Sequence, residues 1–171
     1  TDSSFDAYDL INNYDDQQLE NVFNQFGDFR KSESKRLAKT IIDSRVINSI
    51  ETTFQLVSII EPLVPVKIRN QFLARVFQSI RIEVNQELNA LVDFLSQLPE
   101  VLSENGIACI ITYHSLEDRL VKNFFKSGNC EGFLEKDFFG NINKPFTVIN
   151  KKPITPSDIE IKTNPRARSA K

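Results

Sequence analysis

The hydrophobic positions of this chain fall at helical spacing over most of its length, in short groups before residue 70 and in one long series after it. One short group follows Asp15 and Asp16 and ends at Gly27, and its apolar members are Leu19, Val22, Phe23 and Phe26. An aspartate accepts hydrogen bonds from the free N–H groups at a helix start, and glycine tolerates the left-handed turn after a helix end. The pattern therefore predicts a helix between them.

Three further short helices are expected around this one. The first covers about one turn within residues 5–11. The second begins at Ser32 or Ser34, and its apolar positions are Leu37, Ile41 and Ile42. The third begins at Thr52 or Thr53 and stops before Pro62, because proline cannot continue a helix. Together these elements predict a small helical module.

The long series starts near Asn70 and recurs at steps of three and four residues, through Leu73, Phe77, Ile80, Val84, Leu88, Leu91, Leu95 and Leu98. This spacing predicts one apolar stripe on a long helix, or on two helices nearly in line. Pro99 is expected to end or kink it.

A different pattern follows Gly106. Residues 107–113 form a continuous apolar run rich in β-branched side chains, which predicts a buried strand. The next residues resemble the start of a helix, with Ser115 able to accept from a backbone N–H group. His114, the only histidine of the chain, thus falls in a strand-to-helix turn. Ligands of open α/β sheets gather at such turns, so the segment predicts both an α/β fold and the location of a site.

The strand count is too low for a complete sheet. A strand that is apolar on both faces needs neighbours, and only two short β-like pieces follow, at 146–150 and 152–155. They predict a late hairpin or edge strands, because Pro153 cannot sit in a central strand. The five glycines never cluster, and no glycine-rich phosphate loop or acidic ribose anchor is found. If the fold is of the nucleotide-binding type, its cofactor half is expected to lie outside this chain.

Composition narrows the class of protein. A length of 171 residues suits one domain, or one domain with a small companion, and the net charge of −2 argues against coating nucleic acid by bulk charge. No segment has the pattern of a membrane span or a signal peptide.

Cys109 and Cys130 lack metal-ligand spacing, so no metal site is expected. A buried free Cys109 in a reducing cytosol is preferred to a disulfide. The absence of methionine, including at position 1, hints that the chain does not begin where its gene does; an excised initiator and chance are the alternative.

Four stretches resemble the MraW/RsmH family of methyltransferases. They are Phe77–Leu88, Thr112–Arg119, Lys152–Ser157 and Asn164–Lys171, which occur in the family's order. The motifs His-Ser-Leu-Glu-Asp-Arg, from His114, and Asn-Pro-Arg-Ala-Arg-Ser-Ala-Lys, from Asn164, are long enough to be specific. Two earlier stretches, Ala7–Tyr14 and Glu51–Phe54, resemble the helical domain that the family inserts into its catalytic core.

The resemblance implies an S-adenosylmethionine-dependent enzyme that methylates the N4 amine of a cytosine in small-subunit ribosomal RNA. It implies an inserted helical domain over residues 1–69 and, over 70–171, the later part of a Rossmann-like class I methyltransferase core of α/β class. Family members carry a further stretch before the point where Thr1 stands, which holds the glycine-rich loop and the ribose-binding acid. No cofactor-binding residue can therefore be carried over to this chain.

His114 and Glu117 are the catalytic candidates. His114 could hydrogen-bond the base or a phosphate, or remove a proton, because a histidine titrates near neutral pH. The alternative is a histidine that only ties its turn to nearby backbone. Glu117 and Asp118 could equally serve the helix start, where carboxylates complement the dipole. Asp118 is expected to be structural, and Arg119 could bind phosphate or pair locally.

Two further groups are candidates for contact with RNA or the cleft. One group, on one side of the long helix, consists of Gln78, Arg81 and Asn85. The alternative to contact with the cleft is that this side is only a solvated helix face. The basic tail carries Arg166, Arg168 and Lys171, which could contact phosphates or close over the cofactor.

Alternative functions stay open. The chain could be a non-catalytic RNA- or ribosome-binding helical module, or a helical interaction domain whose α/β part is only a scaffold. The expected partner is small-subunit ribosomal RNA or the ribosomal subunit, in the cytoplasm and with no membrane. Unpaired sheet edges and fourteen phenylalanines leave a homodimer open. The chain by itself is expected to bind no S-adenosylmethionine and to be inactive.

Overall fold

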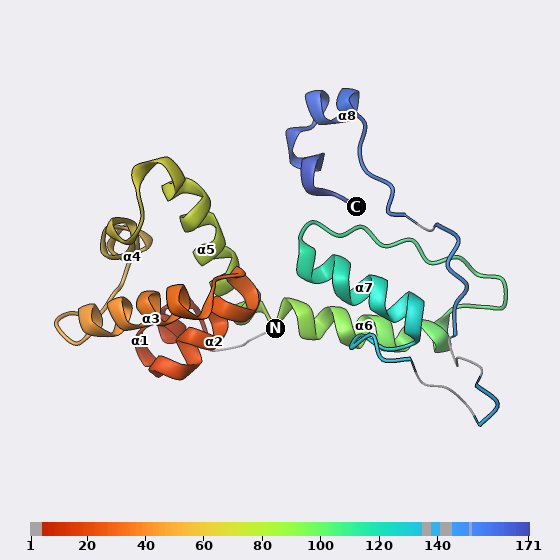
Figure 1. The fold of residues 1–171 in the computed structure, drawn as a ribbon, viewed down its shortest axis with the longest axis horizontal. Coiled ribbons are helices and arrows are strands. Elements are labelled where there is room, and N and C mark those ends of the chain that lie inside the picture. The colour runs from red at the N-terminus through yellow and green to blue at the C-terminus, as the bar shows by residue number, and fades with distance from the viewer. Residues whose placement is uncertain (1–4, 135–137, 141–144, 151) are drawn as a thin grey trace. The chain divides into compact units, whose positions relative to one another are not determined.

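The computed structural model describes residues 5–134, 138–140, 145–150 and 152–171, and contacts divide the chain into two compact units, residues 1–87 and 88–171 (Figure 1). The helices of the first unit are α1 (Ala7–Asn13), α2 (Asp16–Gly27), α3 (Lys31–Arg45), α4 (Thr53–Ile60), the 3₁₀ turns η1 (Glu61–Leu63) and η2 (Val66–Ile68), and α5 (Arg69–Asn85). Those of the second are α6 (Glu87–Val101, which starts at the last residue of the first unit), α7 (Ser115–Ser127), α8 (Asp158–Thr163) and the 3₁₀ turn η3 (Pro165–Ser169).

Capping side chains set the starts of the first helices. Asp15 accepts from the Gln18 N–H group and Thr52 from the Gln55 N–H group, in reciprocal capping boxes, so the predicted starts of α2 and α4 are confirmed. The predicted start of α3 at Ser32 or Ser34 is wrong. Its N-cap is Arg30, which makes no side-chain capping hydrogen bond, and Ser34 lies buried within the helix.

The core of the first unit forms around α2, which packs against α3 and α5. Its fully buried members include Leu10, Leu19, Phe23, Leu37, Ile41, Ile60 and Val76. Gly27 allows the chain to turn tightly at the end of α2, because a Cβ atom there would lie 2.5 Å from the ring of Phe29. Asp28, and not Gly27, takes the left-handed conformation that ends the helix.

The long apolar series forms two helices rather than one. Gln86, in the left-handed conformation, separates α5 from α6. Pro99 lies inside α6, which continues through it and ends two residues later at Val101, so the prediction that the helix ends at Pro99 is wrong. The predicted kink stays a prediction. By contacts α5 belongs with α1–α4, because it packs on α1 and α2. The division into an insert over 1–69 and a core over 70–171 stays a prediction about the family.

The second unit has a smaller core between α6 and α7. Leu95 and Leu98 of α6 pack with Phe124 of α7 and with Cys130, and half-buried apolar side chains surround them. Phe146 adds its ring, 5.8 Å from that of Phe124. Gly128 follows α7 in the left-handed conformation and donates its N–H to the Phe124 carbonyl.

Residues 107–113 are extended but do not form the predicted buried strand. Alternate positions differ in burial, with one set exposed: Ile107 (73%), Cys109, Ile111 (65%) and Tyr113. The intervening set faces the small core or is buried: Ala108, Ile110 and Thr112. Thr112 exchanges two backbone hydrogen bonds with Lys171, of 3.1 and 3.0 Å. The segment therefore has one covered face and one open apolar face. Within the described part of the chain, its backbone pairs with the backbone of Lys171 alone and not with a neighbouring strand, so it is not part of a sheet.

The α/β class is therefore not observed: within the ranges described above, no residue lies in a β-strand. The predicted late hairpin is also wrong for residues 146–150 and 152–155, which are irregular, while residue 151 lies outside the described residues. The residues that follow form α8 and η3, and Ser157 caps α8 by accepting from the Glu160 N–H group.

Both cysteines are free, as expected, but their environments differ. Cys130 is buried, and burial raises the pKa of its thiol. Cys109 is exposed, so its predicted burial is wrong, because it lies on the open face of the extended segment. Among the described residues, no helix combines the length and apolar character needed to cross a bilayer.

Tyr14 ties the start of the first unit to α5. Its hydroxyl donates to Glu83 Oε1 over 2.7 Å, and its ring stacks on Phe5. Burial, and then the neighbouring carboxylate, raise the pKa of the phenol to about 12. Since this value lies above the ordinary 10, the protonated phenol stabilises the fold below pH 10, and that contribution is lost as pH rises from about 10 to 12.

We expect Tyr14→Phe to lower the free energy of unfolding by about 1 kcal/mol at pH 8, the usual worth of one hydrogen bond, and by less at pH 11. Urea denaturation of the wild type and the variant at both pH values measures the gap, that is, the difference between their free energies of unfolding. Tyr8→Phe, at an exposed tyrosine, is the control and should leave the gap near zero at both. A gap for Tyr14→Phe that does not shrink with pH would contradict the role of the phenol proton.

Candidate functional site

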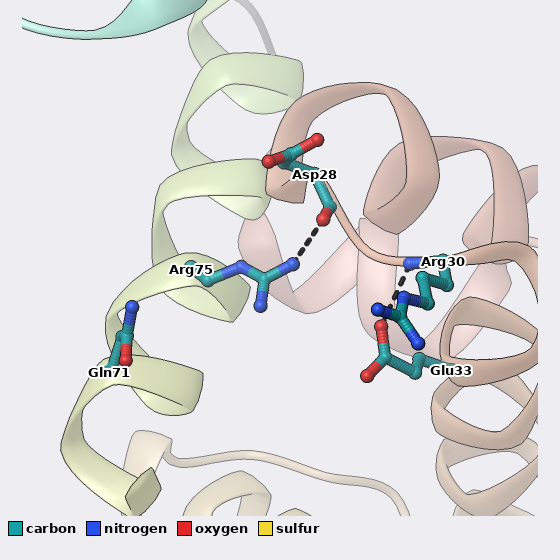
Figure 2. Close-up of a pocket in the computed structure, with 5 residues that line it drawn as sticks. All are labelled: Asp28, Arg30, Glu33, Gln71 and Arg75. Atoms are coloured by element: carbon teal, nitrogen blue, oxygen red, sulfur yellow. Dashed lines mark hydrogen bonds between the residues drawn. The ribbon is translucent and has the colours of Figure 1, made fainter.

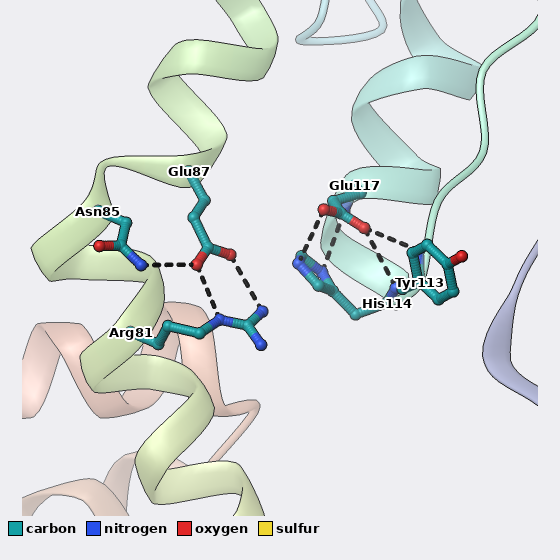
Figure 3. Close-up of polar contacts among 6 residues, drawn as sticks. All are labelled: Arg81, Asn85, Glu87, Tyr113, His114 and Glu117. Carbon is teal, nitrogen blue, oxygen red and sulfur yellow. Dashed lines mark hydrogen bonds and ion pairs between the residues drawn. The ribbon is translucent and has the colours of Figure 1, made fainter. Parts of the chain in front are cut away.

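The predicted histidine turn begins α7, with His114 itself as the N-cap (Figure 3). Its backbone is extended, and its ring nitrogen Nδ1 accepts from the Glu117 N–H group over 3.4 Å. The capping residue was predicted to be Ser115, which is wrong by one position: Ser115 is the first helical residue and is exposed. The predicted helix start is confirmed, but the strand predicted before it is not observed, so the turn is not a strand-to-helix turn in this structure.

The acceptor role of Nδ1 decides what the imidazole can do. In a neutral ring whose Nδ1 accepts, the proton resides on Nε2. That Nε2 is shielded from solvent and has no hydrogen-bond partner in the described part of the chain. Glu117 Oε1 lies 3.4 Å away, within ion-pair distance but outside hydrogen-bond geometry. His114 therefore holds an N–H donor that no described group satisfies.

Glu117 completes the turn from the other side. Its Oε2 accepts from the backbone N–H groups of Tyr113, over 2.8 Å, and of His114, over 3.3 Å. These bonds are the reciprocal half of the capping box and orient the carboxylate toward the imidazole. The structural alternative for Glu117 is thus present in the geometry, and its predicted catalytic role stays a prediction.

The residues after Glu117 connect to the end of the chain. Asp118 Oδ2 lies 3.4 Å from Lys171 Nζ, in a half-exposed ion pair, which agrees with the structural role expected of Asp118. Lys171 is held by this contact and by its backbone bonds to Thr112, so in this structure it braces the turn. Arg119, Arg166 and Arg168 are exposed, the last two on η3. Their contact with RNA stays a prediction.

The second predicted group lies at the end of α5 and is described separately (Figure 3). Arg81 forms a two-bonded ion pair with Glu87, of 2.8 and 3.0 Å, and Asn85 Nδ2 donates to the same carboxylate. These bonds bridge the left-handed Gln86 and hold the end of α5. Gln78 is half-buried on the same helix. The structure thus gives Arg81 and Asn85 a local partner, and any contact with a ligand stays a prediction.

A polar pocket in the first unit was not predicted from the sequence (Figure 2). Its volume is about 440 Å³, and its lining residues are Asp28, Arg30, Glu33, Gln71 and Arg75. The Arg75 guanidinium stacks on Phe29, 4.0 Å from the ring centre, and donates to the carbonyls of Gly27 and Asp28. The sequence signal that could have indicated this pocket is the alternation Asp28-Phe29-Arg30 after Gly27, because a tight turn there buries the ring and exposes the two charged side chains.

The described residues do not form a site for S-adenosylmethionine. An adenosyl group needs a glycine-rich turn between a strand and a helix, or an equivalent apolar slot. Positive-φ glycines occur only at Gly128, Gly132 and Gly140 among the described residues, and none joins a strand to a helix. The unsatisfied Nε2 of His114 is a single polar atom, and alone it holds no nucleoside.

Comparison with known sequences places this chain in a described protein family. The model of one protein family, described as the MraW methylase family, matches residues 1–171. The chain therefore belongs to the MraW methylase family, as the resemblance of its motifs predicted.

Curated relatives agree with this membership. Ribosomal RNA small subunit methyltransferase H of Bacteroides thetaiotaomicron is 46% identical over 165 residues, which cover 96% of this chain and 54% of that protein. The proteins of the same name in Flavobacterium johnsoniae and Christiangramia forsetii are 46% and 47% identical, and the matches cover 99% and 96% of this chain. The chain spans about half the length of these relatives.

Proposed function

We propose that this chain is part of an S-adenosylmethionine-dependent methyltransferase that modifies the N4 amine of a cytosine in small-subunit ribosomal RNA. The observation that carries the proposal is the family match over residues 1–171, together with relatives named as small-subunit ribosomal RNA methyltransferases. Such a substrate would place the protein in the cytoplasm, with the ribosomal subunit or its RNA as partner. The cofactor would be held by residues outside those described.

The open face of residues 107–113 supports the proposal that the second unit is one part of a larger sheet domain. Its exposed apolar side chains and single backbone pairing are those of a strand that lacks its neighbours. We infer that the class I methyltransferase fold of the family is completed there. His114 would then lie at the carboxyl end of a strand, where α/β enzymes bind their ligands.

Methylation of an exocyclic amine depends on position more than on proton transfer. The cytosine must leave its stack, and the amine must approach the methyl group in line. Because Nδ1 of His114 is occupied and Nε2 carries the proton, the geometry favours hydrogen-bond donation over proton removal. An acceptor on the base or a phosphate would satisfy this N–H group once the atoms covering it move aside.

The proposal is tested in the organism that encodes the chain. Deletion of the gene should remove N4-methylcytidine from small-subunit ribosomal RNA, measured by mass spectrometry of digested nucleosides, and the intact gene should restore it. His114→Asn isolates the imidazole, because asparagine is a good N-cap and keeps the start of α7. We expect restoration by His114→Asn to be slower by about tenfold or more, the worth of one to two lost hydrogen bonds.

Ser115→Ala is the matched control, since Ser115 is exposed beside His114 and caps nothing. It should restore methylation fully. Unchanged N4-methylcytidine after gene deletion would overturn the proposed function and favour the non-catalytic RNA-binding module. Full activity of His114→Asn would leave the histidine with only its capping role.

A further inference from the structure

One side of α3 carries an unpaired row of basic residues. Its buried side consists of Ser34, Leu37, Ala38 and Ile41, which face the core of the first unit. The opposite side is solvent-exposed and holds Lys31, Lys35, Arg36 and Lys39, which we name the basic face. Because Lys31, Lys35 and Lys39 recur every four residues, their attachment points follow one another at steps of about 6 Å along the helix.

These cations have no ion-pair partner among the residues that the structure describes. The ion pairs found there involve other cations, Arg69, Arg81 and Lys171, and the remaining contact of this kind joins His114 to Glu117. Glu33 shares the helix, but its Oε2 accepts from the Arg30 N–H group at the helix start. Asp43 is the single other acid of α3. On a chain whose net charge is −2, α3 therefore concentrates positive charge on one side.

The positive charge continues past the first turn of α3. Arg30 and Arg75 line the polar pocket there (Figure 2). Arg75 is held by its stacking on Phe29 and by the backbone carbonyls of Gly27 and Asp28. A guanidinium fixed in this way loses little further freedom on binding an anion. Asp28 and Glu33 offset part of this charge, so the lysine row carries the inference and the pocket extends it.

The surroundings of the row indicate the kind of partner. A helix that binds membranes turns an apolar side toward the lipid, but the apolar side of α3 lies in the core. A row of flexible ammonium groups suits successive phosphates of a nucleic acid strand, which are contacted one charge at a time. We propose that the basic face of α3 binds the phosphate backbone of RNA. The identity of that RNA, small-subunit ribosomal RNA, rests on the proposed function.

The experiment measures binding of the chain to fluorescently labelled small-subunit ribosomal RNA fragments by anisotropy, across a series of salt concentrations. The triple variant Lys31→Gln, Lys35→Gln and Lys39→Gln should bind about tenfold or more weakly near 0.1 M salt. The slope of log affinity against log salt should fall by about 2, because three phosphate contacts are lost. Circular dichroism checks that the variant keeps its helices.

The matched control removes the same charge elsewhere, as Lys122→Gln, Lys126→Gln and Lys162→Gln, three exposed lysines of α7 and α8. Its salt slope should stay within about 0.5 of the wild type. An equal loss in both triple variants, or no loss in the first, would overturn the proposal. Equally tight binding of polyglutamate would overturn RNA as the partner and favour an acidic protein.

The two proposals fail separately. In one outcome the slope of log affinity against log salt falls in the basic-face variant, while gene deletion leaves N4-methylcytidine unchanged. This result would support the RNA-binding surface and reject the proposed methylation. In the other outcome, gene deletion removes N4-methylcytidine but the salt slope of the basic-face variant is unchanged. This result would reject the basic face alone.

Discussion

Phe23→Ala is expected to lower the free energy of unfolding of the first unit by about 3–5 kcal/mol, the largest effect of any single substitution proposed for this chain. Phe23 is fully buried in α2, at the centre of the helical core, and meets Phe29 edge to face with ring centres 6.5 Å apart. Alanine removes the ring and leaves a cavity that the surrounding helices can fill only in part. Urea denaturation followed by far-ultraviolet circular dichroism measures the loss.

Phe54→Ala is the control for this prediction. Phe54 lies at the start of α4 with 84% of its surface exposed, so its loss should change stability by less than about 0.5 kcal/mol. Similar losses at both positions would show that Phe23 is not central to the core.

Arg45→Met is expected to lower the free energy of unfolding by about 2–3 kcal/mol, the second largest effect. At the end of α3, the guanidinium donates to the carbonyls of Ile11, over 2.6 Å, and of Tyr14, over 2.5 Å. These carbonyls lie at the end of α1, where no helical N–H group is left to pair with them. Charged donors contribute more than neutral ones, and methionine keeps the stem but leaves both acceptors unsatisfied.

Burial lowers the pKa of Arg45, the direction expected where a guanidinium is partly removed from water. Arg36→Met, at an exposed arginine of the same helix, serves as the comparison and should stay within about 0.5 kcal/mol of the wild type by thermal or urea denaturation. A small effect of Arg45→Met would mean that water replaces the guanidinium at both carbonyls.

The helices of the first unit were the most predictable part of the fold. Their starts rest on local hydrogen bonds within one turn, such as that from the Gln18 N–H group to Asp15, and local bonds can be inferred from neighbouring residue types. The start of α3 was less predictable, since Arg30 supplies no side-chain cap and the helix begins where the buried Phe29 fixes the preceding turn.

The histidine turn was predicted in kind, while its geometry required coordinates. The motif indicated a helix start after a buried strand; the helix start is present, and the strand is not. The ring of His114 takes the capping role expected of Ser115. The Glu117 carboxylate accepts from the backbone N–H groups of Tyr113 and His114, and the Glu117 N–H group donates to Nδ1 of His114. Residue types alone do not distinguish two adjacent capping residues.

The sequence by itself determined the family, the amphipathic helices and the place of the histidine turn, since long motifs and local hydrogen bonding are written in neighbouring residues. The tertiary structure decided which faces are covered. It joined α5 to the first unit through packing on α2, left Cys109 and Ile111 on an open face, and joined Lys171 to Thr112. Burial and pairing between distant segments depend on which neighbours come together in space, and no local pattern specifies them.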